Sequence, residues 1–256
     1  MELSFKKIKA LKSKKVRDEL GLFVVEGEKF VLEIPLDWTV RAYICTQERS
    51  HLLEPLRKRA ECIVVTESRF ATLSDTVTPQ GILAICEKRH FSLEELLNTS
   101  ETPFLLIGEC LADPGNIGTL IRTAAAAGAN GVILSKNSGD LFNPKTLRAA
   151  AGAALRIPVV EGADLTETFD GLKQKQVLVL AAHLQGTMLP YSLQLQQGCA
   201  ILVGNEANGL SDDITAKADI LVKLPMKEGQ ESLNASIAGG ILLYEVVRQR
   251  IAISSS

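Results

Sequence analysis

The sequence has few residues of the kinds that bind metal ions or form covalent cross-links. Its 256 residues include five cysteines and three histidines. There is no C-x-x-C pair, and the histidines lack the spacing of zinc ligands. Because the cysteine count is odd and all but Cys110 lie within or beside apolar runs, we expect reduced, buried thiols, no metal site and a cytoplasmic protein. The cysteines are Cys45, Cys62, Cys86, Cys110 and Cys199.

Long apolar runs and common targeting or nucleotide-binding motifs are also missing. No apolar run reaches the length of a membrane span. The first residues, MELSFKKIKALKSKK, lack the apolar core and cleavage site of a secretory signal. Neither a Walker loop nor a G-x-G-x-x-G turn after an early strand is present. These absences argue against a membrane protein, a secreted protein and a dehydrogenase.

Charge is nearly balanced over the whole chain but not along it. The formal net charge is −2, yet residues 6–17, KKIKALKSKKVR, carry seven basic side chains and no acidic one. Such a segment suggests a polyanionic partner such as nucleic acid. A solvated helix face with an ordinary number of lysines would give the same pattern, so charge alone leaves both interpretations open.

Short apolar runs alternate with helical patterns, which predicts an α/β fold with parallel sheets. The polar part of EELLNTSETPF, residues 94–104, is typical of a linker and predicts two domains, residues 1–98 and 103–256. Strands are expected at 22–26, 41–46, 62–66, 81–87, 104–109, 131–135, 157–161, 177–182, 200–205 and 219–225. The main helices of the second domain are expected near 117–127, 144–153, 165–174, 211–217 and 232–251.

The last predicted helix has more apolar surface than contact with one sheet requires. Its apolar residues form a broad stripe at helical spacing: Leu233, Ile237, Ile241, Leu242, Leu243, Tyr244, Val246, Val247 and Ile251. The pair Gly239 and Gly240 disfavours a helix and suggests close approach of another backbone. The helix is either buried within one subunit or, as we expect, also packed across a dimer interface.

Polar residues follow three of the predicted strands at the points where the strands end. The turns are DPGNIGTLIRTAAAAGANG (113–131), LVGNEANGLSDDI (202–214) and LPMKEGQESLNASIAGG (224–240). Because the carboxyl ends of parallel strands meet at one edge of a sheet, their polar side chains can converge on one crevice. The candidates are Asn116, Arg122, Glu206, Ser232 and Asn234.

Each candidate also has an ordinary structural interpretation. Asn116 is expected near a helix N-cap, Arg122 could pair with a surface acid, and Ser232 is an expected N-cap. Asn234, two residues later, has no evident structural need to be an amide. The convergence of three turns favours the functional interpretation.

These turns, together with NPKTLRAAAGAALRIPV (143–159), resemble the SpoU (TrmH-like) family of RNA ribose 2′-O-methyltransferases, within the SPOUT superfamily. The motifs stand in the family's order and spacing and cover most of residues 104–251. The segment RDELGLFVVEGEKFVLE (17–33) resembles, more weakly, the small α/β/α substrate-binding domain that precedes the catalytic domain in many of these enzymes. One departure is Ala235, where many relatives have a bulkier β-branched residue.

The resemblance implies a fold, a methyl donor and a reaction. The fold is a parallel sheet whose C-terminal part forms a deep trefoil knot, and the donor, S-adenosylmethionine, is held by the knot loops. At the matching positions Gly204 leaves room for the donor, Leu224 and Leu233 flank its adenine, and Met226 lies close by. The reaction is methyl transfer to a ribose 2′-hydroxyl by a homodimer that needs no metal.

The resemblance also implies catalytic roles and an RNA substrate. Arg122, acting from the partner subunit, is either the proton acceptor or, as its permanent charge favours, the ligand of the adjacent phosphate. Glu206 would position Arg122 or the ribose, while Asn116, Ser232 and Asn234 would orient the hydroxyl and the donor. The basic N-terminal segment would hold a folded RNA through its phosphates. Ribosomal RNA is expected by analogy; transfer RNA, or a non-catalytic RNA-binding or assembly role, are the alternatives.

Overall fold

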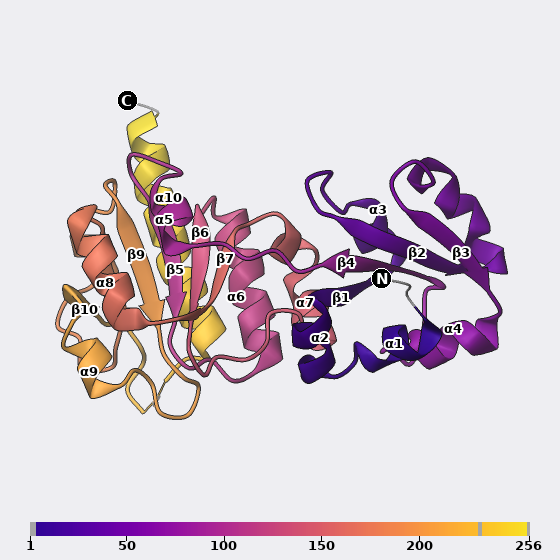
Figure 1. The fold of residues 1–256 in the computed structure, drawn as a ribbon. Coiled ribbons are helices and arrows are strands. Elements are labelled where there is room, and N and C mark those ends of the chain that lie inside the picture. Colours follow the sequence, from indigo (N-terminus) through magenta and orange to yellow (C-terminus); the bar gives the residue numbers. More distant parts are fainter. Residues whose placement is uncertain (1–3, 230–231, 255–256) are drawn as a thin grey trace.

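The chain forms two β-sheets that lie next to each other, each with its own helices (Figure 1). The computed structural model describes residues 4–229 and 232–254. Strands β1 to β4 make the first sheet, and strands β5 to β10 make the second. The two sheets correspond to an earlier and a later part of the sequence, so each part of the chain builds its own core.

The first sheet is mixed, with the strand order β1-β4-β2-β3. β4 runs antiparallel to both β1 and β2, whereas β2 and β3 are parallel. The expectation of parallel strands is therefore wrong here, because alternating apolar runs and helices carry no signal for strand direction. The strands are β1 Leu22–Glu26, β2 Val40–Thr46, β3 Glu61–Val65 and β4 Ile82–Glu87. The helices are α1 Phe5–Ala10, α2 Lys14–Leu20, α3 Glu28–Leu32, the 3-10 helix η1 Gln47–Leu56 and α4 Glu67–Leu73.

All strands of the second sheet are parallel, in the order β10-β8-β9-β5-β6-β7, which confirms the predicted parallel sheet. From β5 the chain adds β6 and β7 on one side and then places β8, β9 and β10 on the other. The direction of sheet growth reverses between β5 and β9, and open α/β sheets bind ligands at such points. The strands are β5 Phe104–Gly108, β6 Gly131–Ser135, β7 Val159–Ala163, β8 Leu178–Ala182, β9 Cys199–Val203 and β10 Ile220–Val222.

Helices cover both faces of the second sheet. Leu106 of β5 packs in the cluster that includes α6 and α10, whereas its neighbour Leu105 packs in the cluster that includes α8. Because successive side chains of a strand point to opposite faces, burial on both sides explains the continuous apolar runs. One face carries α6 Pro114–Ala126, α7 Pro144–Ala150 and α10 Ala235–Ser254, and the other carries α5 Leu93–Leu97, α8 Leu165–Gln174 and α9 Asp212–Thr215. Two 3-10 helices, η2 Ala153–Leu155 and η3 Pro190–Ser192, complete the later part.

The short helix α5 packs with the second sheet. Leu96 and Leu97 are buried in the same cluster as Phe169 and Leu172 of α8. Packing thus groups residues 93–97 with the later part of the chain, and the division between residues 98 and 103 stays a prediction.

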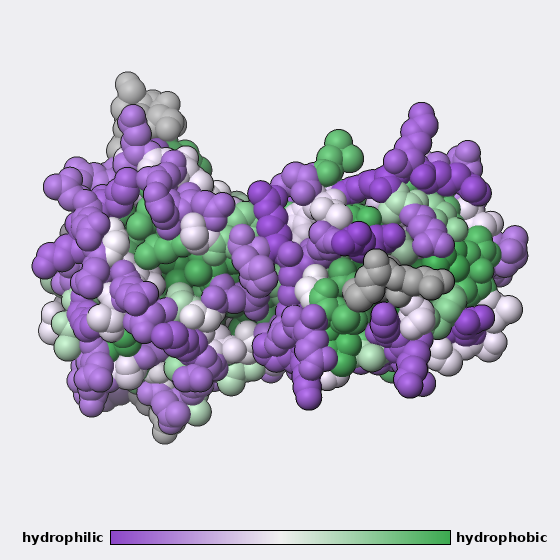
Figure 2. Space-filling view, in the orientation of Figure 1, coloured by the Kyte–Doolittle hydropathy of each residue, from purple (hydrophilic) through white to green (hydrophobic). Residues whose placement is uncertain are grey.

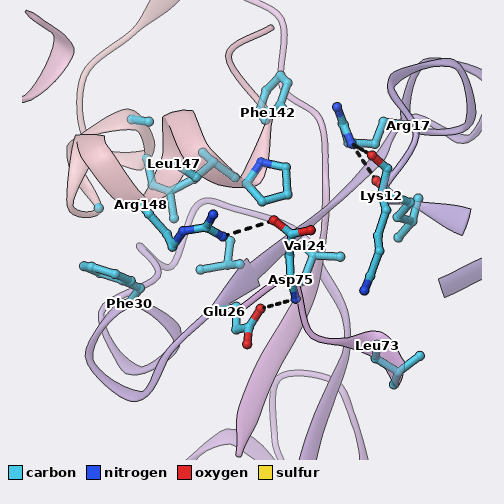
Figure 3. A pocket seen from close by; sticks show the side chains of 16 residues that line it. Lys12, Arg17, Val24, Glu26, Phe30, Leu73, Asp75, Phe142, Leu147 and Arg148 are labelled. Atoms are coloured by element: carbon cyan, nitrogen blue, oxygen red, sulfur yellow. Dashed lines mark hydrogen bonds and ion pairs between the residues drawn. The ribbon is translucent and has the colours of Figure 1, made fainter. Parts of the chain in front are cut away.

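Aromatic contacts and ion pairs join the two sheets. The ring of Phe23 in β1 lies 4.5 Å, between centroids, from that of Phe142. Trp38 Nε1 donates a hydrogen bond to the carbonyl oxygen of Leu155 at 2.8 Å. Arg148 Nη1 of α7 donates to Asp75 Oδ2 at 3.3 Å. Figure 3 shows the Arg148 side chain pointing toward Asp75. These contacts fix the orientation of the two parts.

The junction uses part of the basic N-terminal segment. Arg17 is 2% exposed and pairs with Asp140. Lys12 Nζ instead donates within the earlier part of the chain, to the carbonyl oxygen of Ser74. The expectation that residues 6–17 as a whole contact RNA phosphates is therefore wrong at Arg17, because a side chain buried in the protein cannot reach RNA.

The cysteines are free thiols at all five positions. Burial raises the pKa of Cys45 and Cys199 to about 11 and that of Cys86 to about 12. The expected buried thiols are confirmed at these positions, whereas Cys62 and Cys110 are half-buried. Across residues 4–229 and 232–254, no helix combines the length and apolar character needed to cross a bilayer.

Candidate active site

A cavity of about 390 Å³ opens at the carboxyl ends of β8, β9 and β10. The loops that follow these strands line it, together with the start of α10. Its volume lies in the range of small-molecule sites. The sequence candidates Gly204, Glu206, Leu224, Met226, Ser232 and Leu233 all line this cavity.

Asn116, Glu206 and Asn234 form a hydrogen-bonded chain beside the cavity. Asn116 Nδ2 donates to Glu206 Oε1 at 3.0 Å, and Asn234 Nδ2 donates to Asn116 Oδ1 at 2.9 Å. The three side chains come from the first turn of α6, which follows β5, from the turn after β9 and from the N-cap of α10. The structure thus brings side chains from all three turns to one place.

Glu206 is held in its ionised form by several donors. Besides Asn116, the backbone N–H groups of Ala112 and Asp113 donate to its carboxylate at 3.1 and 3.2 Å. Burial opposes ionisation of Glu206, but these hydrogen bonds outweigh it and lower the pKa of the carboxyl. Because both oxygens already accept hydrogen bonds at the start of α6, Glu206 is suited to position groups and not to remove a proton.

The turn after β9 requires glycine at position 204. A Cβ there would lie 2.3 Å from the carbonyl carbon of Gly209 and 2.4 Å from the backbone nitrogen of Leu210. The backbones of Asn205 and Gly209 exchange two hydrogen bonds of 2.9 Å, which fold the turn back on itself. A side chain at position 204 would therefore clash first with the backbone of the turn itself.

The loop after β8 also lines the cavity, although nothing in the sequence analysis singled it out. The N–H of His183 donates to the carbonyl of Val222 at 3.0 Å, and the N–H of Lys223 donates to that of Met188 at 2.9 Å. A Cβ at Gly186 would lie 2.8 Å from the backbone nitrogen of Lys223. The sequence could have indicated this loop, because it follows the predicted strand 177–182, which ends at the same sheet edge as the strands before the other turns.

Asn116 lies near the N-cap of α6, as expected, but is not the capping residue itself. The helix begins at Pro114 and its N-cap is Asp113, whose side chain accepts from the Asn116 N–H at 2.9 Å. Asn116 therefore lies within the first turn, and its amide side chain remains available for Glu206.

Asn234, and not Ser232, caps α10. Its Oδ1 accepts from the backbone N–H groups of Ser236 and Ile237 at 2.8 and 3.3 Å. The expectation that Asn234 has no structural need to be an amide is therefore wrong. Its oxygen caps the helix while its nitrogen donates to Asn116, so an amide serves both contacts.

Arg122 lies apart from this cluster within one protomer. It is exposed on α6 and lines a different groove, which also includes Lys29 and Arg156. Among the described residues, its side chain forms no hydrogen bond or ion pair. A single subunit therefore does not place the predicted catalytic residues in one cavity.

The helix α10 has a buried and an exposed apolar side. Leu243 is 0% exposed, and a Cβ at Gly239 would lie 2.6 Å from Leu120 Cδ2 of α6. The small residue at 239 thus allows close packing on a side chain of α6, and not on another backbone as the sequence suggested. On the opposite side, Ile237, Ile241 and Tyr244 are 53%, 39% and 51% exposed.

Comparison with known proteins identifies the family of this chain. Residues 103–244 match the model of the SpoU rRNA Methylase family. The chain belongs to that family. Residues 4–84 also match the MRM3-like substrate binding domain. The relative "23S rRNA (guanosine(2553)-2′-O)-methyltransferase RlmP" of Bacillus subtilis is 34% identical over 93% of each chain.

Solved structures of SpoU proteins resemble the whole chain. The SpoU methyltransferase AviRb of Streptomyces viridochromogenes, in complex with AdoMet, superimposes with a TM-score of 0.89 at 27% identity and covers 98% of this chain and 99% of its own. The AdoMet-bound rRNA methyltransferase of Sinorhizobium meliloti has a TM-score of 0.84 at 31% identity, covering 95% of this chain and 94% of its own. The similarity to these solved structures therefore includes both sheets of the present structure.

Proposed function

We propose that this protein transfers a methyl group from S-adenosylmethionine to a ribose 2′-hydroxyl of ribosomal RNA. The observation that carries the proposal is the Asn116–Glu206–Asn234 chain beside a small-molecule cavity, in a chain of the SpoU family. The names of the Bacillus and Sinorhizobium relatives support ribosomal RNA over transfer RNA.

The cavity suits the methyl donor. Leu224 and Leu233 give it apolar walls, and the backbones of the loops after β8, β9 and β10 supply hydrogen-bonding groups. Such a combination suits an adenine ring, which main-chain groups can recognise without charged side chains. Gly204, Leu224, Met226 and Leu233 would hold the donor. When bound, S-adenosylmethionine supplies an electrophilic methyl group on a positively charged sulfur.

The polar residues would orient the reacting hydroxyl. A ribose hydroxyl is a weak nucleophile at neutral pH, so alignment with the methyl group and assistance to proton loss both matter. Asn116, Ser232 and Asn234 offer amide and hydroxyl groups beside the cavity, while ionised Glu206 fixes Asn116. In this scheme Glu206 is a positioning residue.

Arg122 would complete the site from a second subunit. The exposed apolar residues of α10, Ile237, Ile241 and Tyr244, form a surface that a partner copy would cover. Arg122 lies on α6, next to Thr123. The Cγ2 atom of Thr123 would lie 3.5 Å from a Cβ at Gly240 of α10, so α6 and α10 pack side by side at this point. A dimer formed through this face would carry Arg122 toward the partner's cavity, where its guanidinium would bind the phosphate next to the target ribose.

We further propose that the chain is knotted at the cavity. The segment after β10 lines the cavity together with the loops that follow β8 and β9. A Cβ at Gly186, in the loop after β8, would lie 2.8 Å from the Leu221 carbonyl oxygen and the Lys223 nitrogen, and this close approach supports a threaded arrangement. The knot would set the cavity walls by backbone contacts, in exception to the rule that chains are unknotted.

The earlier part of the chain, predicted as residues 1–98, would bind RNA as a substrate domain, and a cytoplasmic location would follow from a ribosomal substrate. The match of residues 4–84 to a substrate binding domain supports this role. A non-catalytic RNA-binding role is the competing function, and it would not require the polar cluster beside the cavity.

The decisive experiment is methyl transfer to RNA with identification of the product. The protein is incubated with radiolabelled S-adenosylmethionine and unmethylated 23S rRNA, and the RNA is then hydrolysed in alkali. A ribose 2′-O-methyl group protects its own phosphodiester from alkali, so label should appear in dinucleotides. Label in base-methylated mononucleotides, or donor binding without any transfer, would contradict the proposal.

A further inference from the structure

A groove of about 790 Å³ lies between the two parts of the chain, and its described lining shares no residue with that of the donor cavity. We call it the interdomain groove; its described lining is Lys29, Phe30, Thr99, Arg122, Ala125, Ala126, Ala129, Asn130, Ala151, Ala153, Arg156, Ile157 and Pro158. It therefore has walls from α3 of the first sheet and from α6 and η2 of the second. The molecule narrows between these two parts (Figure 2).

The charge of this groove has one sign. Its described lining includes Lys29, Arg122 and Arg156 and no aspartate or glutamate. The whole chain has a formal net charge of −2, so this local excess of cations is not an average property of the surface. The side chains of Lys29 and Arg122 form no ion pair with any described residue, and a polyanion could bind them without breaking an internal contact.

The shape of the groove suits an extended strand. Alanines of α6 and η2 form much of its surface, and such short side chains leave room for a bulky backbone to lie against the protein. The half-buried ring of Phe30 offers an aromatic face near Arg156. A Cβ at Gly152 would lie 3.6 Å from Phe30 Cδ1 and 3.5 Å from Arg156 Nη2. Single-stranded nucleic acid is held in this way, with cations along its backbone and aromatic rings against its bases.

We propose that the interdomain groove binds the phosphates of the RNA strand that carries the target ribose. Lys29 and Arg156 would contact phosphates that neighbour the one assigned to Arg122. The inference rests on the proposed function, because that function defines the role of Arg122. It adds a second surface that holds the same strand and joins the substrate domain to the catalytic domain.

The first test measures RNA affinity of Lys29→Ala with a fluorescent 23S rRNA transcript at several salt concentrations. Loss of one phosphate contact on single-stranded RNA lowers the salt slope by about 0.7, which corresponds to about fivefold weaker binding at 0.1 M salt. Lys173→Ala is the matched control, because Lys173 is an exposed lysine of α8 on the opposite face of the second sheet. Unchanged affinity and slope in Lys29→Ala would overturn the proposal.

A second pair of variants separates phosphate binding from domain contact. Arg156 forms an ion pair with Glu33, so Arg156→Ala removes a cation and also breaks a contact across the junction. Glu33→Ala breaks the same contact and keeps the cation. We expect Arg156→Ala to weaken RNA binding about fivefold and Glu33→Ala to leave it unchanged or tighter. Equal weakening in both variants would overturn the role of Arg156.

The outcomes also distinguish this inference from the proposed function. If Lys29→Ala weakens RNA binding but the unmodified protein transfers no methyl group, the groove stands as a binding site and the proposed function fails. If the unmodified protein methylates ribose and Lys29→Ala binds RNA normally, only the inference about the groove fails. Calorimetry with S-adenosylmethionine should give the same affinity for every groove variant.

Discussion

Replacing Gly204 by alanine should damage the donor cavity through a clash of known size. An ordinary contact of Cβ with a heavy atom is at least 3.4 Å, and the new Cβ would lie 2.3 Å from the Gly209 carbonyl carbon. The difference, 3.4 − 2.3, requires a backbone shift of about 1.1 Å in a turn that lines the cavity. Overpacking of this kind costs about 2 kcal/mol, which corresponds to a fall in Tm of about 4–8 °C.

Calorimetry with S-adenosylmethionine and thermal melting provide the assay. We expect Gly204→Ala to bind the donor at least about tenfold more weakly, because the displaced turn forms one wall of the cavity. Gly128→Ala is the control: Gly128 has a positive φ of 76° but no atom within 4 Å of its Cβ, so it tests backbone strain without a clash. Normal donor affinity in Gly204→Ala would refute the reasoning.

Three further results should follow. Arg122→Ala should lower methyl transfer at least about 100-fold, while calorimetry gives a donor affinity within about twofold of the unmodified protein; a large loss of donor binding would contradict this division. The pKa of Glu206 is lowered in the folded protein, so its stabilising contribution is complete above the ordinary glutamate pKa and is lost as pH falls through the lower folded value. The Tm difference between the unmodified protein and Glu206→Gln should therefore be constant from about pH 6 to 8 and vanish in acid; a difference that grows in acid would be inconsistent. Tyr244→Lys should convert a dimer to a monomer in light scattering, whereas Leu36→Lys, at a 90% exposed leucine of the earlier part of the chain, should not; a Tyr244→Lys dimer would argue against the α10 face.

The sequence predicts the second sheet well because its strands are buried on both faces. Their apolar runs are continuous, and the polar turns that follow them stand out. The direction of β4 was not predictable, because an antiparallel strand buried on both faces looks the same in sequence as a parallel one. Burial of Arg17 was equally invisible, since its partner Asp140 lies 123 residues away.

Some features of the candidate site were likewise predictable from the sequence, and others were not. The rule that strand ends meet at one sheet edge was sufficient to select Asn116, Glu206 and Asn234. The same rule did not reveal that Asn234 caps α10, because capping depends on the helix beginning at Ala235 rather than Ser232. The position of Arg122 on a separate groove depends on how α6 is rotated about its axis, which the spacing of a short alanine-rich helix does not determine.

The central claim is that a working site combines the polar cluster of one protomer with Arg122 of its partner. Mixed dimers of Arg122→Ala and Asn116→Ala test it most directly, because each variant alone should be inactive. In an equal mixture half the dimers are mixed and each has one intact composite site, so about a quarter of normal methyl transfer should return. If transfer in the mixture stays at the level of the separate variants although mixed dimers form, Arg122 does not act across the interface and the account is wrong.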